Sequence, residues 1–283
     1  MAELAPPPPF IASRRQRRML DLTYQPGFRG VAYFCLFMLY APIVVLVIYS
    51  FNANPSVTIW TEFGTNWYVK VAANQYIQNA AITSLKIAVV ATIGATIAAT
   101  AAALATTRTL PYRGLGTAYV IINLPLMVPE IVTAVATLSF FAMGRTLLGI
   151  DLGLANLMLA HMVFCIPFAY LPIRARLEDM DRTLEQAAAD LYASPWHAFR
   201  RITLPLLTPG IVAGAMLAFI TSIDDVTITT LVAGPGQTTL PIYIFGQIRR
   251  GITPETNAAS TIMLAVSVLL VSLFFFLAQR RKK

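Results

Sequence analysis

Charged residues are scarce in this sequence. Asp, Glu, Lys and Arg make up 12% of its 283 residues, against about 25% in an average soluble domain. Hydrophobic residues make up 57%. A soluble fold of this length would have too few polar side chains to cover its surface, so the composition indicates an integral membrane protein.

Cysteine, histidine and lysine are also few, which excludes several kinds of chemistry. Cys35 and Cys165 lie in apolar runs, and His161 and His197 lie far apart in the sequence, so we expect neither a disulfide nor a metal site. None of the four lysines follows a glycine, and a P-loop needs that pair to reach nucleotide phosphates. The chain is therefore not expected to be an enzyme or to carry a cofactor of its own.

Long apolar runs are abundant. A bilayer core of about 30 Å requires roughly 20 mostly apolar residues in each helix that crosses it. Stretches that meet this requirement are 30–52, 81–105, 116–142, 154–173, 206–228 and 258–278. We predict an all-α integral membrane protein with six transmembrane helices, in which residues 30–283 form a single transmembrane domain and residues 1–29 form a basic cytoplasmic tail.

Positive charge is distributed unevenly between the predicted loops. With both termini in the cytoplasm, 16 of the 21 Lys and Arg residues lie on the cytoplasmic side and four lie outside, while Lys86 lies near the outer end of the second span. The positive-inside rule therefore predicts that both termini are cytoplasmic. Because the basic residues are grouped between apolar runs, we expect a membrane protein without nucleic-acid binding.

Three carboxylates fall within the predicted spans: Glu130, which follows Pro125 and Pro129, and the adjacent Asp224 and Asp225. At a rise of about 1.5 Å per residue, all three lie in the outer half of the membrane. Ionisable groups at membrane depth usually face a cavity or a partner and mark pathways. Two interpretations stay open. The three acids line a path for a cationic substrate, or Glu130 is a buried hydrogen-bonding group while the aspartates cap or end the fifth span.

The polar segment between the fourth and fifth spans predicts two short helices. Thr183 and Gln186 fit a capping box at the start of the first helix, and Ser194 with Pro195 fits the start of the second. Apolar side chains, namely Leu184, Leu191, Trp196 and Phe199, would suit docking into a groove of a partner. A helix that lies on lipid headgroups is the alternative.

This segment resembles the cytoplasmic signature of permease subunits of bacterial ABC importers, which is Glu-Ala-Ala, three residues, Gly, nine residues, then Ile-x-Leu-Pro. The spacing is matched by Gln186-Ala187-Ala188, Tyr192 and Ile202-Thr203-Leu204-Pro205, with Gln186 in place of Glu and Tyr192 in place of Gly. Other passages, among them Met127-Val128-Pro129-Glu130-Ile131-Val132 and Ser222-Ile223-Asp224-Asp225-Val226, are similar to the spermidine/putrescine permease subgroup.

The resemblance implies an ABC type I importer permease fold in the bacterial inner membrane. It implies a second permease subunit as partner, two ATPase subunits that bind the ATP, and a periplasmic substrate-binding protein. It places a coupling helix in segment 184–205 and contacts to the ATPase at Leu184, Gln186, Ala187, Ala188, Leu191, Tyr192, Ile202, Leu204 and Pro205. The expected substrate is a polyamine such as spermidine or putrescine, with Glu130, Asp224 and Asp225 along its path. Alternatives are an importer of an amino-acid derivative, thiamine or ferric ion, and a secondary transporter or channel that works without an ATPase.

Overall fold

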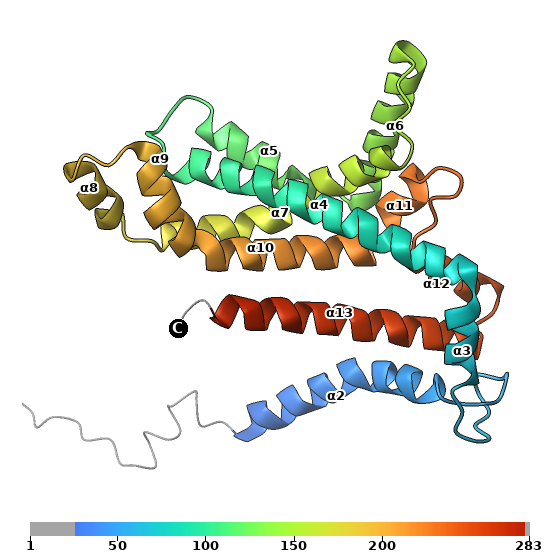
Figure 1. Cartoon of the computed structure of the whole chain (residues 1–283). Coiled ribbons are helices and arrows are strands. Elements are labelled where there is room, and N and C mark those ends of the chain that lie inside the picture. Colours follow the sequence, from blue (N-terminus) through green and yellow to red (C-terminus); the bar gives the residue numbers. More distant parts are fainter. Residues whose placement is uncertain (1–25, 281–283) are drawn as a thin grey trace, which may run out of the picture. The chain divides into compact units, whose positions relative to one another are not determined.

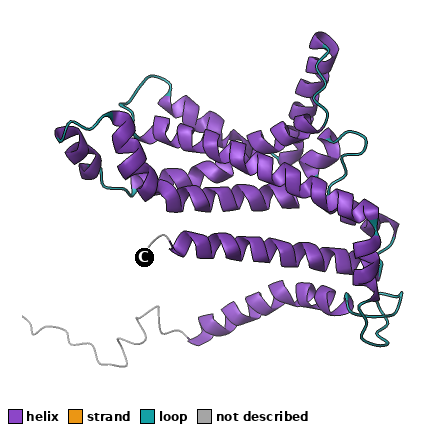
Figure 2. Cartoon of the chain, in the orientation of Figure 1, coloured by secondary structure: helices purple, strands orange, loops and turns teal. Residues whose placement is uncertain are grey.

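The structure is a computed structural model that describes residues 26–280, and these residues are almost entirely helical (Figure 2). The chain divides into two compact units, residues 1–49 and 50–283. The described part of the first unit is a single helix, α2 (Pro26–Tyr49), with Pro42 in its interior. Most of the predicted basic tail, residues 1–29, lies outside the described residues.

The second unit contains the remaining helices (Figure 1). These are α3 (Asn66–Ala73), α4 (Gln75–Thr107), α5 (Leu115–Met127), α6 (Glu130–Leu148), α7 (Leu154–Glu178), α8 (Thr183–Asp190), α9 (Pro195–Ala198), the π-helical η2 (Phe199–Thr203), α10 (Leu204–Asp224), α11 (Thr227–Val232), α12 (Leu240–Arg250) and α13 (Pro254–Arg280).

In the part of the chain that the structure describes, six helical segments are long and apolar enough to cross a membrane, which confirms the predicted number. They are Gly27–Tyr49, Gln75–Thr107, Glu130–Leu148, Leu154–Glu178, Pro195–Asp224 and Pro254–Phe276. Two of the predicted boundaries are wrong, and both errors lie where the chain breaks inside an apolar run.

The third predicted span, 116–142, is not one helix. Val128 and Pro129 are extended, with ψ angles of 138° and 132°, and they separate α5 from α6. Proline has no backbone N–H and disfavours the helical conformation of the residue before it, which explains the break at Val128. Only α6 has the length of a membrane span, and α5 is a shorter apolar helix.

The fifth predicted span, 206–228, ends early. Helix α10 stops at Asp224, and Asp225 is extended, with φ −64° and ψ 132°. A new helix, α11, begins at Thr227. The hydropathy of the run continues across the break, so hydropathy alone does not reveal it.

The core of the second unit is the packing of α4, α7 and α10, which lie side by side in Figure 1. Helix α4 buries a row of small residues with a period of four: Ala91, Ala95, Ala99 and Ala103. Helix α10 buries Gly210, Gly214 and Ala218 at the same spacing. Without side-chain bulk the helix backbones approach closely, and dispersion contacts then hold the helices together where water is absent.

Candidate functional site

The two helix breaks lie next to each other. Helix α11 packs against α6, so the start of α6 after Pro129 adjoins the start of α11 after Asp225. Each break places a carboxylate at a helix start, Glu130 as the first residue of α6 and Asp225 two residues before α11. The partial positive charge at a helix N-terminus stabilises a carboxylate there.

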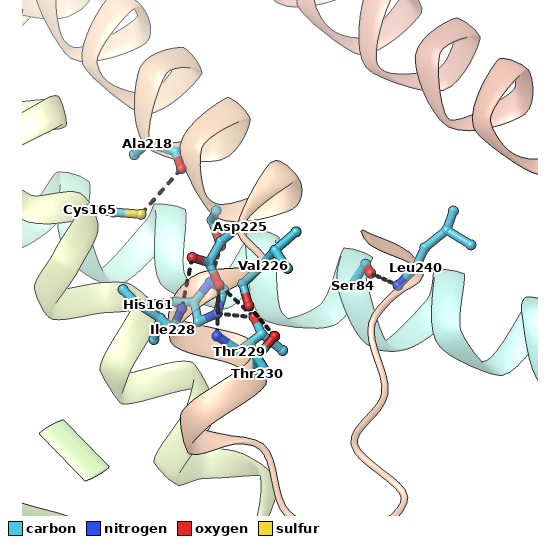
Figure 3. Close-up of polar contacts among 11 residues, drawn as sticks. Ser84, His161, Cys165, Ala218, Asp225, Val226, Ile228, Thr229, Thr230 and Leu240 are labelled. Atoms are coloured by element: carbon cyan, nitrogen blue, oxygen red, sulfur yellow. Dashed lines mark hydrogen bonds and ion pairs between the residues drawn. The ribbon is translucent and has the colours of Figure 1, made fainter. Parts of the chain in front are cut away.

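Asp225 caps α11 from a buried position (Figure 3). Its Oδ1 accepts a hydrogen bond from the backbone N–H of Ile228 at 3.1 Å. Its Oδ2 accepts hydrogen bonds from the backbone N–H of Thr229 at 2.8 Å and from the Thr229 hydroxyl at 2.7 Å. The carboxylate thus supplies acceptors for donors that the first turn of a helix leaves unpaired.

His161 on α7 joins this cap to the end of α10 (Figure 3). The imidazole is 1% exposed, and its Nδ1 lies 2.9 Å from the Ser222 hydroxyl while its Nε2 lies 2.9 Å from the Thr229 hydroxyl and 3.4 Å from Oδ2 of Asp225. Because Thr229 donates its one proton to Asp225, Nε2 of His161 must donate to Thr229. In the neutral imidazole, Nδ1 then accepts from Ser222.

The three predicted path residues differ in their surroundings. Glu130 is half-buried, and its carboxyl group interacts with the side chains of Asp225 and Thr227. Asp224 is exposed at the end of α10 and makes no hydrogen bond or ion pair with residues 27–276. The structure therefore brings Glu130 and Asp225 together, while the side chain of Asp224 stays free of both.

The role of His161 was not predicted from the sequence, where this residue was weighed as a metal ligand. Within the described part of the chain, no group of three or more His, Cys, Asp or Glu side chains could hold a metal ion. A signal was present in the sequence, because a histidine within an apolar run must find polar partners when it is buried. The sequence does not name Ser222 and Thr229 as those partners, since only the fold brings 161, 222 and 229 together.

The segment predicted as the coupling helix forms α8, then a turn, then α9 and η2, and η2 continues directly into α10. The predicted cap at Thr183 is wrong: Thr183 is the first residue of α8, and its N–H donates to the Asp181 carboxylate at 2.9 Å. Hydrogen bonds from Thr183 hold the pKa of Asp181 below its usual value. The start predicted at Ser194 is confirmed, since the Ser194 hydroxyl accepts from the N–H of His197.

Helix α8 ends in a left-handed turn at Tyr192, the position of the signature glycine. Tyr192 has φ 59°. Its N–H donates to the carbonyl of Ala189 at 2.9 Å, and the N–H of Ala193 donates to the carbonyl of Ala188 at 3.0 Å. This pair of bonds is the Schellman motif, whose left-handed residue is usually glycine. The chain thus forms the turn that the signature glycine favours, with a tyrosine in its place.

The side chains of this segment divide into buried and exposed groups. Ala188 is 6% exposed and belongs to the packing of the segment. Leu191, Tyr192 and Trp196 are 82%, 97% and 69% exposed. Leu184, Gln186, Ala187 and Pro205 are also exposed, whereas Ile202 and Leu204 are half-buried. Several exposed apolar side chains in one short segment, here Leu184, Leu191 and Trp196, are typical of a surface that another protein or a membrane covers.

Comparison with known proteins agrees with this architecture. A family model described as "Binding-protein-dependent transport system inner membrane component" matches residues 113–281. The putrescine transport system permease protein PotI of Escherichia coli (strain K12) is 38% identical over 247 residues, which cover 87% of this chain and 88% of that protein. The spermidine/putrescine transport system permease protein PotC of Haemophilus influenzae is 39% identical over 235 residues, which cover 83% and 90%.

Solved structures share the fold at low sequence identity. A chain of a bacterial ABC transporter that imports the acidic polysaccharide alginate superposes with a TM-score of 0.71 at 15% identity, over 95% of this chain and 98% of that one. A chain of the MetNI methionine ABC transporter, in an inward-facing conformation, superposes with a TM-score of 0.59 at 20% identity, over 72% and 93%.

Proposed function

Because this chain belongs to the family of binding-protein-dependent transport system inner membrane components, as the permease of an ABC importer, we propose that it carries a polyamine of the putrescine and spermidine class. The observation that supports this substrate is the similarity to PotI and PotC, at 38% and 39% identity over most of the chain. The acidic groups at the two helix breaks are of the right charge for a di- or tri-cation.

The proposed path runs past the two breaks. Glu130 is half-buried and Asp224 is exposed, and each offers a carboxylate. Asp225 is buried, so in this proposal its negative charge attracts the substrate without contacting it. A carboxylate at membrane depth must be compensated, and a passing ammonium group is one form of compensation.

The importer works with ATPase and binding-protein partners, and we propose that segment 184–205 docks on the ATPase. Its most exposed apolar side chains, Leu191 and Trp196, lie on either side of the turn at Tyr192. We also propose that the partner permease is a second, similar chain, that the transmembrane domain spans 30–283, and that the tail 1–29 is cytoplasmic.

Transport in proteoliposomes tests the substrate. The complex of this chain, its partner permease, the ATPase and the binding protein should take up labelled putrescine or spermidine when ATP is supplied inside, and excess unlabelled polyamine should compete. ATP-dependent uptake of thiamine, an amino-acid derivative or ferric ion in place of polyamine would contradict the proposal.

The path is tested by neutralising its accessible acids. Glu130→Gln and Asp224→Asn keep side-chain size and remove charge, so both should lower polyamine uptake while the complex assembles normally. Lys70→Gln, a charge change in helix α3, is the control. Unchanged uptake in both variants would leave these acids a structural role alone.

A further inference from the structure

Glu185 connects α8 to two elements of the membrane core. Nε of Arg108, the residue that caps the C-terminus of α4, lies 3.2 Å from Oε2 of Glu185. The hydroxyl of Thr203, at the end of η2, donates to Oε1 of Glu185 at 2.9 Å. One carboxylate on α8 therefore contacts both the end of α4 and the start of α10.

A second contact joins the start of α8 to α4. The guanidinium of Arg182, the residue before α8, donates to the carbonyl oxygen of Thr107 at 2.6 Å. That carbonyl belongs to the last turn of α4, whose final carbonyls have no partner within the helix. The beginning of α8 is thus anchored to α4 by both a backbone acceptor and an ion pair.

The ion pair is largely withdrawn from solvent. The side chains of Arg108 and Glu185 are 12% and 24% exposed. Among residues 27–276, Nη2 of Arg108 is buried and has no acceptor, so loss of Glu185 would leave the guanidinium charge poorly compensated. Poorly solvated pairs are screened less by salt and water than surface pairs. Gln186, at the signature position for glutamate, is instead exposed and neutral.

The helices that Glu185 contacts reach the other end of the fold. Helix α4 has 33 residues, about 50 Å at the helical rise. Helix α10 runs from Leu204 to Asp224, next to the break that Asp225 caps. A rigid helix transmits a displacement along its length. A movement of α8 that pulls on Glu185 would therefore shift the break between α10 and α11, where Asp225 lies.

We propose that Glu185 is a positioning residue that transmits displacements of α8 to α4 and α10 through Arg108 and Thr203. The inference rests on the proposed docking of segment 184–205 on the ATPase. Its consequence is specific: without Glu185 the ATPase still binds and hydrolyses ATP, but less substrate crosses the membrane for each ATP consumed.

The test measures putrescine uptake and ATP hydrolysis in the same proteoliposomes, each stimulated by the loaded binding protein. Glu185→Gln should lower the uptake per ATP on the order of fivefold, the lower end of typical coupling effects, while the ATPase stays bound. Thr203→Val, which removes one hydrogen bond to the same carboxylate, should give a smaller loss. The double variant Arg108→Glu with Glu185→Arg should recover part of it.

The control is Glu178→Gln, because Glu178 also pairs with an arginine, Arg174, at 2.8 Å, but within one helix. It should leave uptake per ATP unchanged. Wild-type uptake per ATP in Glu185→Gln, or in Thr203→Val should Glu185→Gln fail to assemble, would overturn the inference. Failure of the wild-type chain to retain the ATPase would instead overturn the docking proposal. Uptake of another solute would overturn the polyamine proposal, and uptake per ATP would then be measured with that solute in place of putrescine.

Discussion

At the scale of single residues, Tyr192 shows how the chain tolerates a departure from its family signature. A left-handed non-glycine residue costs about 1–2 kcal/mol. Tyr192 is 97% exposed, so no packing of its side chain compensates. The turn persists because the Schellman hydrogen bonds to Ala188 and Ala189 hold it.

The effect of replacing Tyr192 on the stability of the turn should therefore depend only on how easily the new residue adopts a positive φ. Tyr192→Gly is expected to slow amide hydrogen exchange in 183–193, with a gain of about 1 kcal/mol. Tyr192→Val, with a β-branched side chain, should speed that exchange. Faster exchange in the glycine variant than in the wild type would contradict this account of the turn.

Asp225 and its neighbour Asp224 form a matched pair for a second prediction. Asp225→Asn turns one carboxylate oxygen into a donor that faces the donors of Ile228 or Thr229. Leaving a buried group unpaired costs about 1–3 kcal/mol, so the thermal unfolding midpoint of the purified complex should fall.

Asp224→Asn changes an exposed side chain without described partners, so the unfolding midpoint should stay within experimental error of the wild type. An equal loss of stability in the two variants would show that Asp225 is not the cap that distinguishes them.

The sequence predicted these residues better than it predicted their partners. Acidic side chains in an apolar run are conspicuous, so Glu130, Asp224 and Asp225 could be selected without a structure. Asp225 faces Thr229 and His161, whereas Asp224 is exposed. This difference depends on the extended backbone at Asp225, which no local pattern specifies. The cap predicted at Thr183 was wrong because α8 already begins at Thr183, whose own N–H donates to the Asp181 carboxylate.

At the scale of helices, the number of spans follows from hydropathy, whereas the breaks within them do not. Pro129 gave a local warning of the break between α5 and α6, because proline removes a helical hydrogen bond. Pro42, Pro167 and Pro209 lie inside helices that continue past them. Neighbouring helices can satisfy the freed backbone groups in a membrane protein, so proline alone does not decide where a helix ends.

The contact between α7 and α10 yields an element-scale prediction. A Cβ atom on Gly214 would lie 2.5 Å from the carbonyl oxygen of Ala169, which is backbone and cannot rotate away. Gly214→Ala must therefore push the two helices apart, at a cost of about 1–3 kcal/mol. Thermal unfolding of the purified complex measures it.

The control is Gly144→Ala in α6, where a Cβ would meet nothing within 4 Å. Alanine is the better helix former by up to about 1 kcal/mol, so this variant should be neutral or more stable. If Gly214→Ala were as stable as Gly144→Ala, the close approach of α7 and α10 would not be a determinant of stability.

At the scale of the whole molecule, the proposed membrane orientation rests on where the basic residues lie. Segment 184–205 carries Arg200 and Arg201 in η2, just before α10, and Arg108 and Arg113 follow the end of α4. If these two regions face the cytoplasm, they lie on the side where ATPases bind. The break between α10 and α11, where Asp225 lies, is then toward the opposite side. The proposed docking and the proposed path thus require the same orientation.

Reporter fusions test that orientation. A reporter that is active only in the periplasm should be inactive when fused after Lys283 and active when fused in the loop between α11 and α12, and a cytoplasmic reporter should give the reverse pattern. Cytoplasmic Lys and Arg resist translocation, so removing the four basic residues 280–283 should leave the pattern unchanged as long as the arginines beside α4 and α10 remain. Periplasmic activity at the C-terminus would place segment 184–205 outside the cell and would contradict the coupling proposal together with the topology.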